Sequence, residues 1–174
     1  MLRRLRANAP ALLVPAAWAV VLGAHVDLVA TRTLLIAHLV MTALLVAFAV
    51  LSYRDMREGV LSVWWLVIAG GVPVTAAGLV GLAVPALGQP LLPVAVGGWM
   101  LLPAAALLET GREMPAADAH APTIYLAAGG LCLVGALAYF GGLLFVGGQR
   151  ALVAGLVLVG VGQTASIVDA VVRY

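Results

Sequence analysis

Six long apolar segments, separated by short polar stretches, dominate the sequence. A helix needs roughly 20 mostly apolar residues to cross the hydrocarbon core of a bilayer, and each segment reaches about that length. The predicted spans are residues 9–29, 32–52, 60–84, 90–109, 122–146 and 150–172. Because helices satisfy their own backbone hydrogen bonds in lipid, we predict an all-α integral membrane bundle of six transmembrane helices. Residues 1–174 then form a single transmembrane domain.

The composition agrees with a lipid-facing surface. Hydrophobic residues make up 64% of the chain and charged residues 9%, whereas soluble domains carry about a quarter charged residues. The net charge of +2 is too small to indicate a nucleic-acid partner. We therefore expect a multi-pass protein of the cell membrane whose main partner is the lipid bilayer.

The distribution of arginine predicts the orientation. Positively charged residues near the ends of spans favour the cytoplasmic side. Arg32 and Arg150 fall on one predicted side, and the other side holds Arg3, Arg4, Arg6, Arg54, Arg57, Arg112 and Arg173. Both termini are therefore predicted to be cytoplasmic. Because short loops make sequential helices antiparallel neighbours, we expect an up-down bundle.

The first segment also has features of a secretory signal. A basic start is followed by an apolar run, with Gly23-Ala24 as the candidate cleavage site. The run is long, however, contains Pro10 and Pro15, and is followed at once by a second span. We expect a retained first helix.

The third and fourth segments contain helix-breaking residues. Gly70, Gly71 and Pro73 lie in the third, Gly97, Gly98 and Pro103 interrupt the fourth, and Pro85, Pro90 and Pro93 bracket the turn between them. Proline removes a helix hydrogen bond and clashes with the preceding turn, so both helices are expected to kink. Interrupted helices line binding sites in some transporters. Glycine and proline are also simply more frequent in membrane helices, and this alternative stays open.

The fifth and sixth segments are rich in small residues. Helix five carries Gly135, Ala138, Gly141 and Gly142, and helix six carries Ala151, Gly155, Gly160 and Gly162. Small residues let helix backbones approach closely in lipid. We predict packing surfaces, either inside the bundle or toward a homo-oligomer or a larger membrane complex.

Ionisable or strongly polar residues inside a membrane are functional candidates. The candidates are His25, Asp27, His38, Glu109, Asp169 and Gln163. Glu109 precedes Arg112 by three residues and Asp169 precedes Arg173 by four, which predicts ion pairs on one helix face. Gln163 is expected to hydrogen-bond a neighbouring helix. Alternatively, Asp27, Gln163 and Asp169 belong to an intramembrane polar path.

His25 and His38 flank the predicted turn between the first two helices. Each lies roughly 10 Å from the turn at 1.5 Å rise per residue, so the two histidines sit at similar depth. Two imidazoles at one depth suit the axial ligands of a b-type heme, or part of a metal site. Ordinary interhelical hydrogen bonds remain the alternative. His120 lies in the opposite loop, roughly 20 Å or more away given a core near 30 Å, so it cannot join this site.

The second predicted span resembles a helix of a known protein family. Ala37-His38-Leu39-Val40-Met41 followed by an apolar run resembles the second helix of subunit I of the heme–copper oxidases. That resemblance implies a heme-ligating role for His38. The family also uses an adjacent histidine pair for copper and about twice as many spans, and this chain has neither. The resemblance therefore does not extend to oxygen reduction.

No motif indicates an enzyme. The sequence has no Walker loop, no HExxH and no GxSxG, and Cys132 is its single cysteine. The leading hypothesis is an accessory or structural membrane subunit. The alternatives are a b-type heme protein for electron transfer or heme handling, and a small transporter or channel built on helices three and four.

Overall fold

A computed structural model describes residues 2–114, 121–145 and 148–173, and within these ranges it does not describe the side chains of residues 2–10, 89, 121 and 173. The chain is all-α. The helices are α1 (Leu2–His25), α2 (Thr31–Ser52), α3 (Val60–Ala83), α4 (Pro85–Glu113), α5 (Ala121–Leu144) and α6 (Gln149–Arg173). Each predicted segment corresponds to one helix, with the largest differences in α1 and α4. Helix α1 begins seven residues and ends four residues earlier than the predicted span, and α4 begins five residues earlier and ends four residues later.

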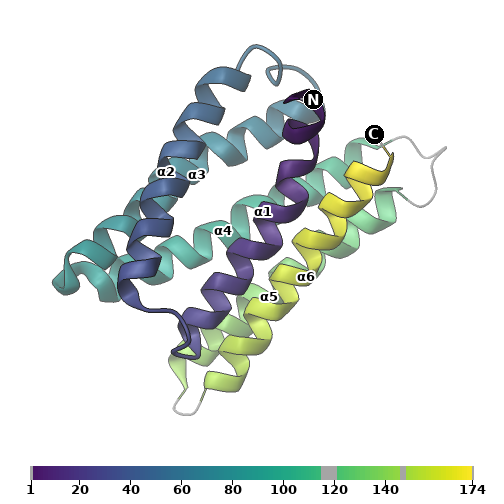
Figure 1. Cartoon of the computed structure of the whole chain (residues 1–174). Coiled ribbons are helices and arrows are strands. Elements are labelled where there is room, and N and C mark those ends of the chain that lie inside the picture. Colours follow the sequence, from purple (N-terminus) through teal and green to yellow (C-terminus); the bar gives the residue numbers. More distant parts are fainter. Residues whose placement is uncertain (1, 115–120, 146–147, 174) are drawn as a thin grey trace.

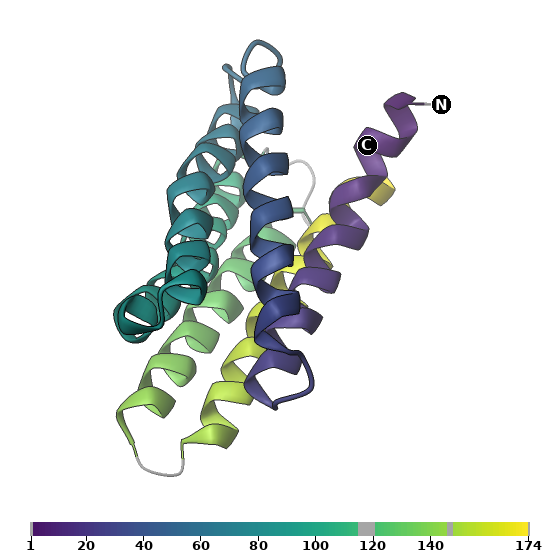
Figure 2. The same cartoon turned by 60° about the vertical axis from the view of Figure 1, so that its left-hand side comes forward.

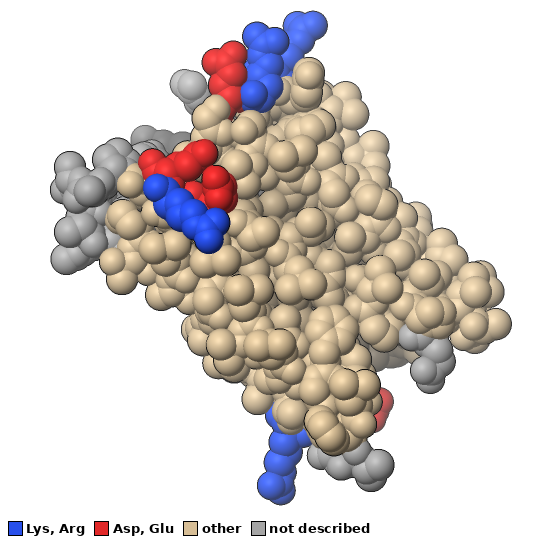
Figure 3. Space-filling model, turned by 180° about the vertical axis from the view of Figure 1, so that it is seen from behind, with Lys and Arg blue, Asp and Glu red and all other residues tan. Residues whose placement is uncertain are grey.

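The chain is a multi-pass membrane protein by the length and composition of its helices. Among the described residues, five helices are long and apolar enough to cross a bilayer: α2, α3, the Pro90–Glu113 part of α4, the Pro122–Leu144 part of α5 and the Gln149–Val172 part of α6. The apolar part of α1 with described side chains, Ala11–His25, is shorter. On the face in Figure 3, charged side chains gather at the two ends, and a wide uncharged belt lies between them.

The helices do not all pack in chain order. From α2 to α6 each helix packs on the next, but α1 packs along α6 and barely touches α2. Figure 1 shows α1 running alongside α6, and Figure 2 shows α1 and α2 diverging from the turn that joins them. The expectation of sequential neighbours therefore fails for this pair. The physical reason is that polar side chains of α1 find their partners on α5 and α6.

Small residues determine how closely the helices approach. A Cβ added to Gly135 would lie 2.7 Å from the Gly155 carbonyl oxygen, and one added to Gly155 would lie 2.5 Å from that of Gly135. The two backbones are thus in direct contact, as the small residues of α5 and α6 predict for packing inside the bundle. Gly141 has nothing within 4 Å of its added Cβ.

Helices α3 and α4 are each continuous, although Pro73 lies inside the first, and Pro90, Pro93 and Pro103 lie inside the second. Pro85 begins α4 in its first turn, where a missing backbone N–H costs nothing. The buried residues of α3 lie on one face, and they are Val67, Gly71, Thr75, Gly78 and Gly81. Side chains from α2 and α4 pack against the small residues of this face.

We predict that Gly135→Ala lowers the stability of the protein in detergent by about 1–3 kcal/mol, the usual cost of overpacking a tight contact. Gly130→Ala is the matched control on the same helix, because its added Cβ meets nothing within 4 Å. Thermal unfolding followed by circular dichroism measures both. Equal melting temperatures for the two variants would contradict the α5–α6 contact.

Candidate functional site

Gln163 of α6 is the centre of the polar contacts inside the bundle. Its side chain is buried. The Trp18 indole of α1 donates a hydrogen bond of 2.9 Å to Gln163 Oε1. Gln163 Nε2 in turn donates one of 2.9 Å to the backbone carbonyl of Trp99 in α4. One amide thus connects three helices, in agreement with the prediction that Gln163 hydrogen-bonds its neighbours.

The Trp99 backbone carbonyl lacks its usual hydrogen-bond donor within the helix. In an α-helix it would accept from the N–H four residues later, but that residue is Pro103, which has no N–H. Pro103 is buried, so water is not available to this part of the helix. An unpaired backbone group in a bilayer costs several kcal/mol. Gln163 therefore supplies the donor that Pro103 removes.

The polar contacts continue from α4 to α3. The Trp99 indole donates to Thr75 Oγ1 at 2.9 Å, and Thr75 is buried. The same Trp99 ring fills the space beside Gly71, whose added Cβ would lie 2.6 Å from it. Trp18, Gln163, Trp99 and Thr75 thus form a hydrogen-bonded row across α1, α6, α4 and α3, which we call the Gln163 network.

The other tryptophans also donate between helices. Trp64 of α3 donates to Thr110 Oγ1 of α4 at 3.1 Å. Trp65 of α3 donates to the Ala49 carbonyl of α2 at 2.9 Å. All four indoles of the chain thus make hydrogen bonds to another helix.

His25 holds the end of α1 against α5 and α6. Its Nδ1 lies 2.8 Å from the Val21 carbonyl, so in the neutral ring Nδ1 carries the proton and donates. Its Nε2 then accepts from the Tyr139 hydroxyl, 3.0 Å away on α5. The Gln149 amide donates to the His25 carbonyl at 2.6 Å. Both ring nitrogens and the carbonyl are therefore used in structural contacts.

His38 lies on the α3 side of α2. Its Nδ1 is 2.9 Å from the Leu34 carbonyl and donates to it. The other edge of the ring rests on Gly78 of α3, where an added Cβ would lie 2.8 Å from both Nε2 and Cδ2. A glycine at residue 78 is thus what allows the imidazole to approach the α3 backbone.

The structure does not bring His25 and His38 together. His25 contacts α5 through Tyr139, whereas His38 contacts α3 through Gly78, and their two helices diverge (Figure 2). This arrangement gives no support to the predicted pair of heme ligands. Among the described residues, no group of three or more His, Cys, Asp and Glu side chains is placed to hold a metal ion.

Asp27 has a backbone role at the end of α1. Its φ is 59°, which is the left-handed conformation that closes many helices. The Leu28 N–H bonds the Gly23 carbonyl at 2.8 Å, and the Asp27 N–H bonds the Ala24 carbonyl at 3.3 Å. These two bonds form a Schellman motif. The Asp27 side chain itself is exposed.

The remaining candidates lie apart. Glu109 pairs with Arg112 at 3.3 Å, which confirms the predicted ion pair. Asp169 is half-buried and interacts within the chain. The side chain of Arg173, its predicted partner, lies outside the described part, and so does His120. Gln163 and Asp169 are about 9 Å apart along α6 at 1.5 Å per residue, and the buried Ser166 lies between them and donates to the Gln163 carbonyl at 2.9 Å.

The glycines of α3 and α4 do not border the polar cavity that a transporter requires. Cβ atoms added to Gly71, Gly97 and Gly98 would lie 2.6 Å from Trp99, 2.5 Å from Phe140 and 2.6 Å from Val74, respectively. Side chains of neighbouring helices therefore fill these positions. The described structure counts against a substrate path there.

Sequence reasoning missed Trp18, Trp99 and Thr75 of the Gln163 network, and Tyr139 and Gln149, which bind His25. For one contact, the hydrogen bond between Gln163 and the Trp99 carbonyl, the sequence contains a signal. A proline inside an apolar helix leaves the carbonyl four residues earlier without a donor, and Gln163 is a long amide in the interior of the sixth span. Tyr139 offered no such signal, because its partner on α1 depends on which helices pack together.

The chain matches no protein-family model, no curated protein and no solved structure.

We predict that Gln163→Leu destabilises the protein more in the natural background than in a Pro103→Ala background. Alanine restores the backbone N–H that the Trp99 carbonyl lacks, so the loss of the amide then costs less. Interhelical hydrogen bonds in membranes contribute about 0.6 kcal/mol on average and about 1.7 kcal/mol at most, and the coupling should fall within that range.

Denaturation in mixed detergent micelles of the natural protein, both single variants and the double variant measures this coupling. Thr164→Leu, one residue away on α6, is the control for substitution of a polar side chain. Strictly additive effects would show that Gln163 does not compensate for Pro103.

Proposed function

We propose that this chain is an accessory or structural subunit of a membrane assembly. The observation that carries the proposal is the Gln163 network. Gln163 is the most buried of the polar candidate residues, and its amide hydrogen-bonds α1 and α4 to α6. His25 hydrogen-bonds the end of α1 to α5 in the same way. Polar groups used in this manner stabilise a rigid bundle and leave few groups for chemistry or transport.

The small residues of α5 and α6 were one predicted surface for binding a partner. Gly135 and Gly155 face each other within the chain, so they are not available to a partner. Residues that remain on the lipid-facing surface would have to make that contact. Helix α2 presents much of this surface, because it buries only Leu45 and Ser52.

Extraction of the full chain from its native membrane in a mild detergent tests this proposal. We expect the chain to migrate on a native gel with a larger complex of constant stoichiometry, and crosslinking should identify the same partner in repeated preparations. An absorption spectrum of the sample distinguishes the heme alternative. A monomer with a Soret band that is lost in His38→Ala would overturn the proposal.

We further propose that all six helices span the membrane with both termini in the cytoplasm. Both termini lie at the same end of the bundle, opposite the α1–α2 turn (Figure 1). The excess of arginine at the end with the termini favours the cytoplasm for that end. Helix α1 is included because the part that follows Arg6, residues 7–25, is about 29 Å long at 1.5 Å per residue, close to a core of about 30 Å.

We predict that a fluorescent protein fused to the C-terminus is fluorescent in cells, because it folds in the cytoplasm, while an alkaline phosphatase fused there is inactive. Fusions placed after Arg32 or Arg150 should show the opposite pattern. Phosphatase activity of the C-terminal fusion would show that the orientation is reversed.

A further inference from the structure

The connection between α3 and α4 is a tight apolar corner. Helix α3 ends at Ala83 and α4 begins at Pro85, so only Val84 lies between them. Residues 83–87, which we call the α3–α4 corner, are all apolar and all exposed. Val84 and Leu87 are each 43% exposed. The corner therefore presents an apolar surface to its surroundings.

The corner differs in charge from the other two connections at its end of the bundle. The α1–α2 connection has Asp27 and Arg32 beside it, and α6 has Arg150 in its first turn, and these charged residues are exposed. By contrast, residues 59–108 contain no Asp, Glu, Lys, Arg or His, and the nearest strongly polar residue, Gln89, is uncharged. Charged side chains are costly in hydrocarbon and not in water. Their absence from the whole hairpin fits a corner that stays in lipid.

The backbone of the corner needs little from water. Helix ends normally leave N–H and C=O groups that require partners. The Val84 N–H bonds the Val80 carbonyl at 2.8 Å, and the Leu87 N–H bonds the Val84 carbonyl at 2.9 Å. Pro85, in the first turn of α4, has no N–H to satisfy. A corner that satisfies these groups internally tolerates a bilayer better than an open loop does.

The length of α3 places the corner at the far edge of the hydrocarbon core. Trp64 lies near the opposite end of α3, and its indole bonds Thr110 near the end of α4. Indole rings favour the boundary between lipid and water. Val84 follows Trp64 by 20 residues, or about 30 Å at 1.5 Å per residue, which equals a core of about 30 Å only if α3 stands upright. Because spanning helices tilt by about 20° on average, Val84 reaches no farther than the lipid.

The views of the whole chain agree with this depth. The corner lies at the left in Figures 1 and 2, above the α1–α2 turn and above the lower ends of α5 and α6. The two views share a vertical axis. Along that axis, the corner extends less far from the termini than those elements do.

We propose that the α3–α4 corner is embedded in the lipid of the membrane leaflet opposite the termini. The proposal rests on the six-span arrangement and refines it, because α3 and α4 cross the core but their connection does not emerge into water. Lipid is the occupant that the surface favours, since the corner is continuous with lipid-facing residues of both helices. Val80 and Val94 there are 42% and 55% exposed. A partner on that side of the membrane then meets two connections, α1–α2 and α5–α6, instead of three.

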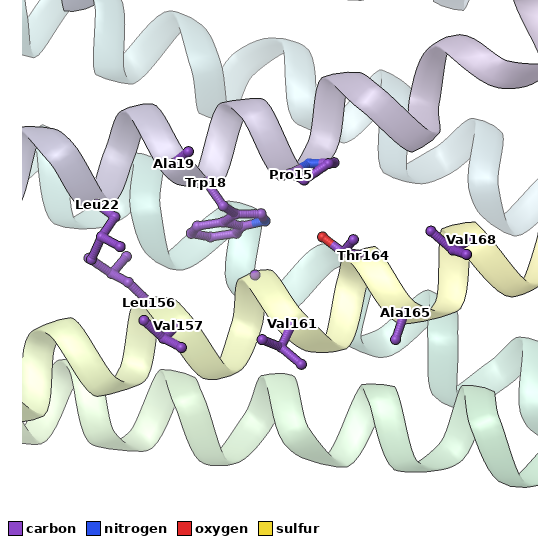
Figure 4. A pocket seen from close by; sticks show the side chains of 11 residues that line it. Pro15, Trp18, Ala19, Leu22, Leu156, Val157, Val161, Thr164, Ala165 and Val168 are labelled. Carbon is purple, nitrogen blue, oxygen red and sulfur yellow. The ribbon is translucent and has the colours of Figure 1, made fainter.

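Thiol labelling of the purified full chain in nanodiscs tests the proposal. Nanodiscs leave both membrane faces accessible, so the result does not depend on orientation, and a purified chain has no partner that could cover the corner. Single cysteines replace Ala86 in the corner, Arg150 in the charged connection and Val161 at the middle of α6. Val161, which Figure 4 shows on α6, is 55% exposed and represents the lipid-facing surface. The natural chain is the blank, because its own Cys132 is buried.

The reagent is a charged, water-soluble maleimide. We expect Ala86→Cys to react as slowly as Val161→Cys and at least about tenfold more slowly than Arg150→Cys, because the reactive thiolate does not form in hydrocarbon. All three cysteines should react equally after denaturation in SDS. Any smaller difference between Ala86→Cys and Arg150→Cys in nanodiscs overturns the proposal. That result would leave the cytoplasmic location of the termini unaffected, since orientation does not enter the measurement.

Spin labels on the same three cysteines provide a second measurement. Molecular oxygen concentrates in lipid, whereas a charged nickel chelate stays in water. Electron paramagnetic resonance should show that oxygen relaxes the labels at residues 86 and 161 more than nickel does, with the opposite order at residue 150. Stronger relaxation by nickel at residue 86 contradicts a corner in lipid. Size-exclusion chromatography confirms beforehand that the variants fold as the natural protein does.

Discussion

The contact between Gln163 and the Trp99 carbonyl is the constraint on which much of this bundle depends. Pro103 leaves that carbonyl without a donor inside a membrane helix, where no water replaces the missing bond. The Gln163 amide meets this need and uses its oxygen to accept from Trp18. The amide thus fixes the register of α6 against α4 and, through Trp18, the position of α1.

The position of α1 follows from two polar contacts. Trp18 binds Gln163 near the middle of the helix, and His25 binds Tyr139 and Gln149 at its end. Hydrogen bonds and close packing drive helix association in lipid, because lipid tails are as apolar as the helix surfaces. Helix α1 therefore lies where its polar partners are, on α6, although α2 is adjacent in sequence.

Much of the candidate site was predictable where the interaction is local. The Glu109–Arg112 pair follows from a spacing of three residues on one helix. The role of Gln163 as an interhelical hydrogen-bonding residue follows from its place inside an apolar span. The relation of His25 to His38 was not predictable in this way. Equal depth in two helices gives no information about the direction in which each side chain points, and the two rings face different neighbours.

The sequence by itself determined the class of the molecule and the extent of its helices. Long apolar runs can satisfy their backbone only as helices in lipid, and polar residues between them mark the ends to within a few residues. Only the tertiary structure decided which helices are neighbours. The apolar surfaces of membrane helices are nearly equivalent to one another and to lipid, so a few scattered contacts determine the packing: a glycine against a backbone, or an amide beside a proline. Those partners lie far apart in the chain, as the 145 residues between Trp18 and Gln163 show.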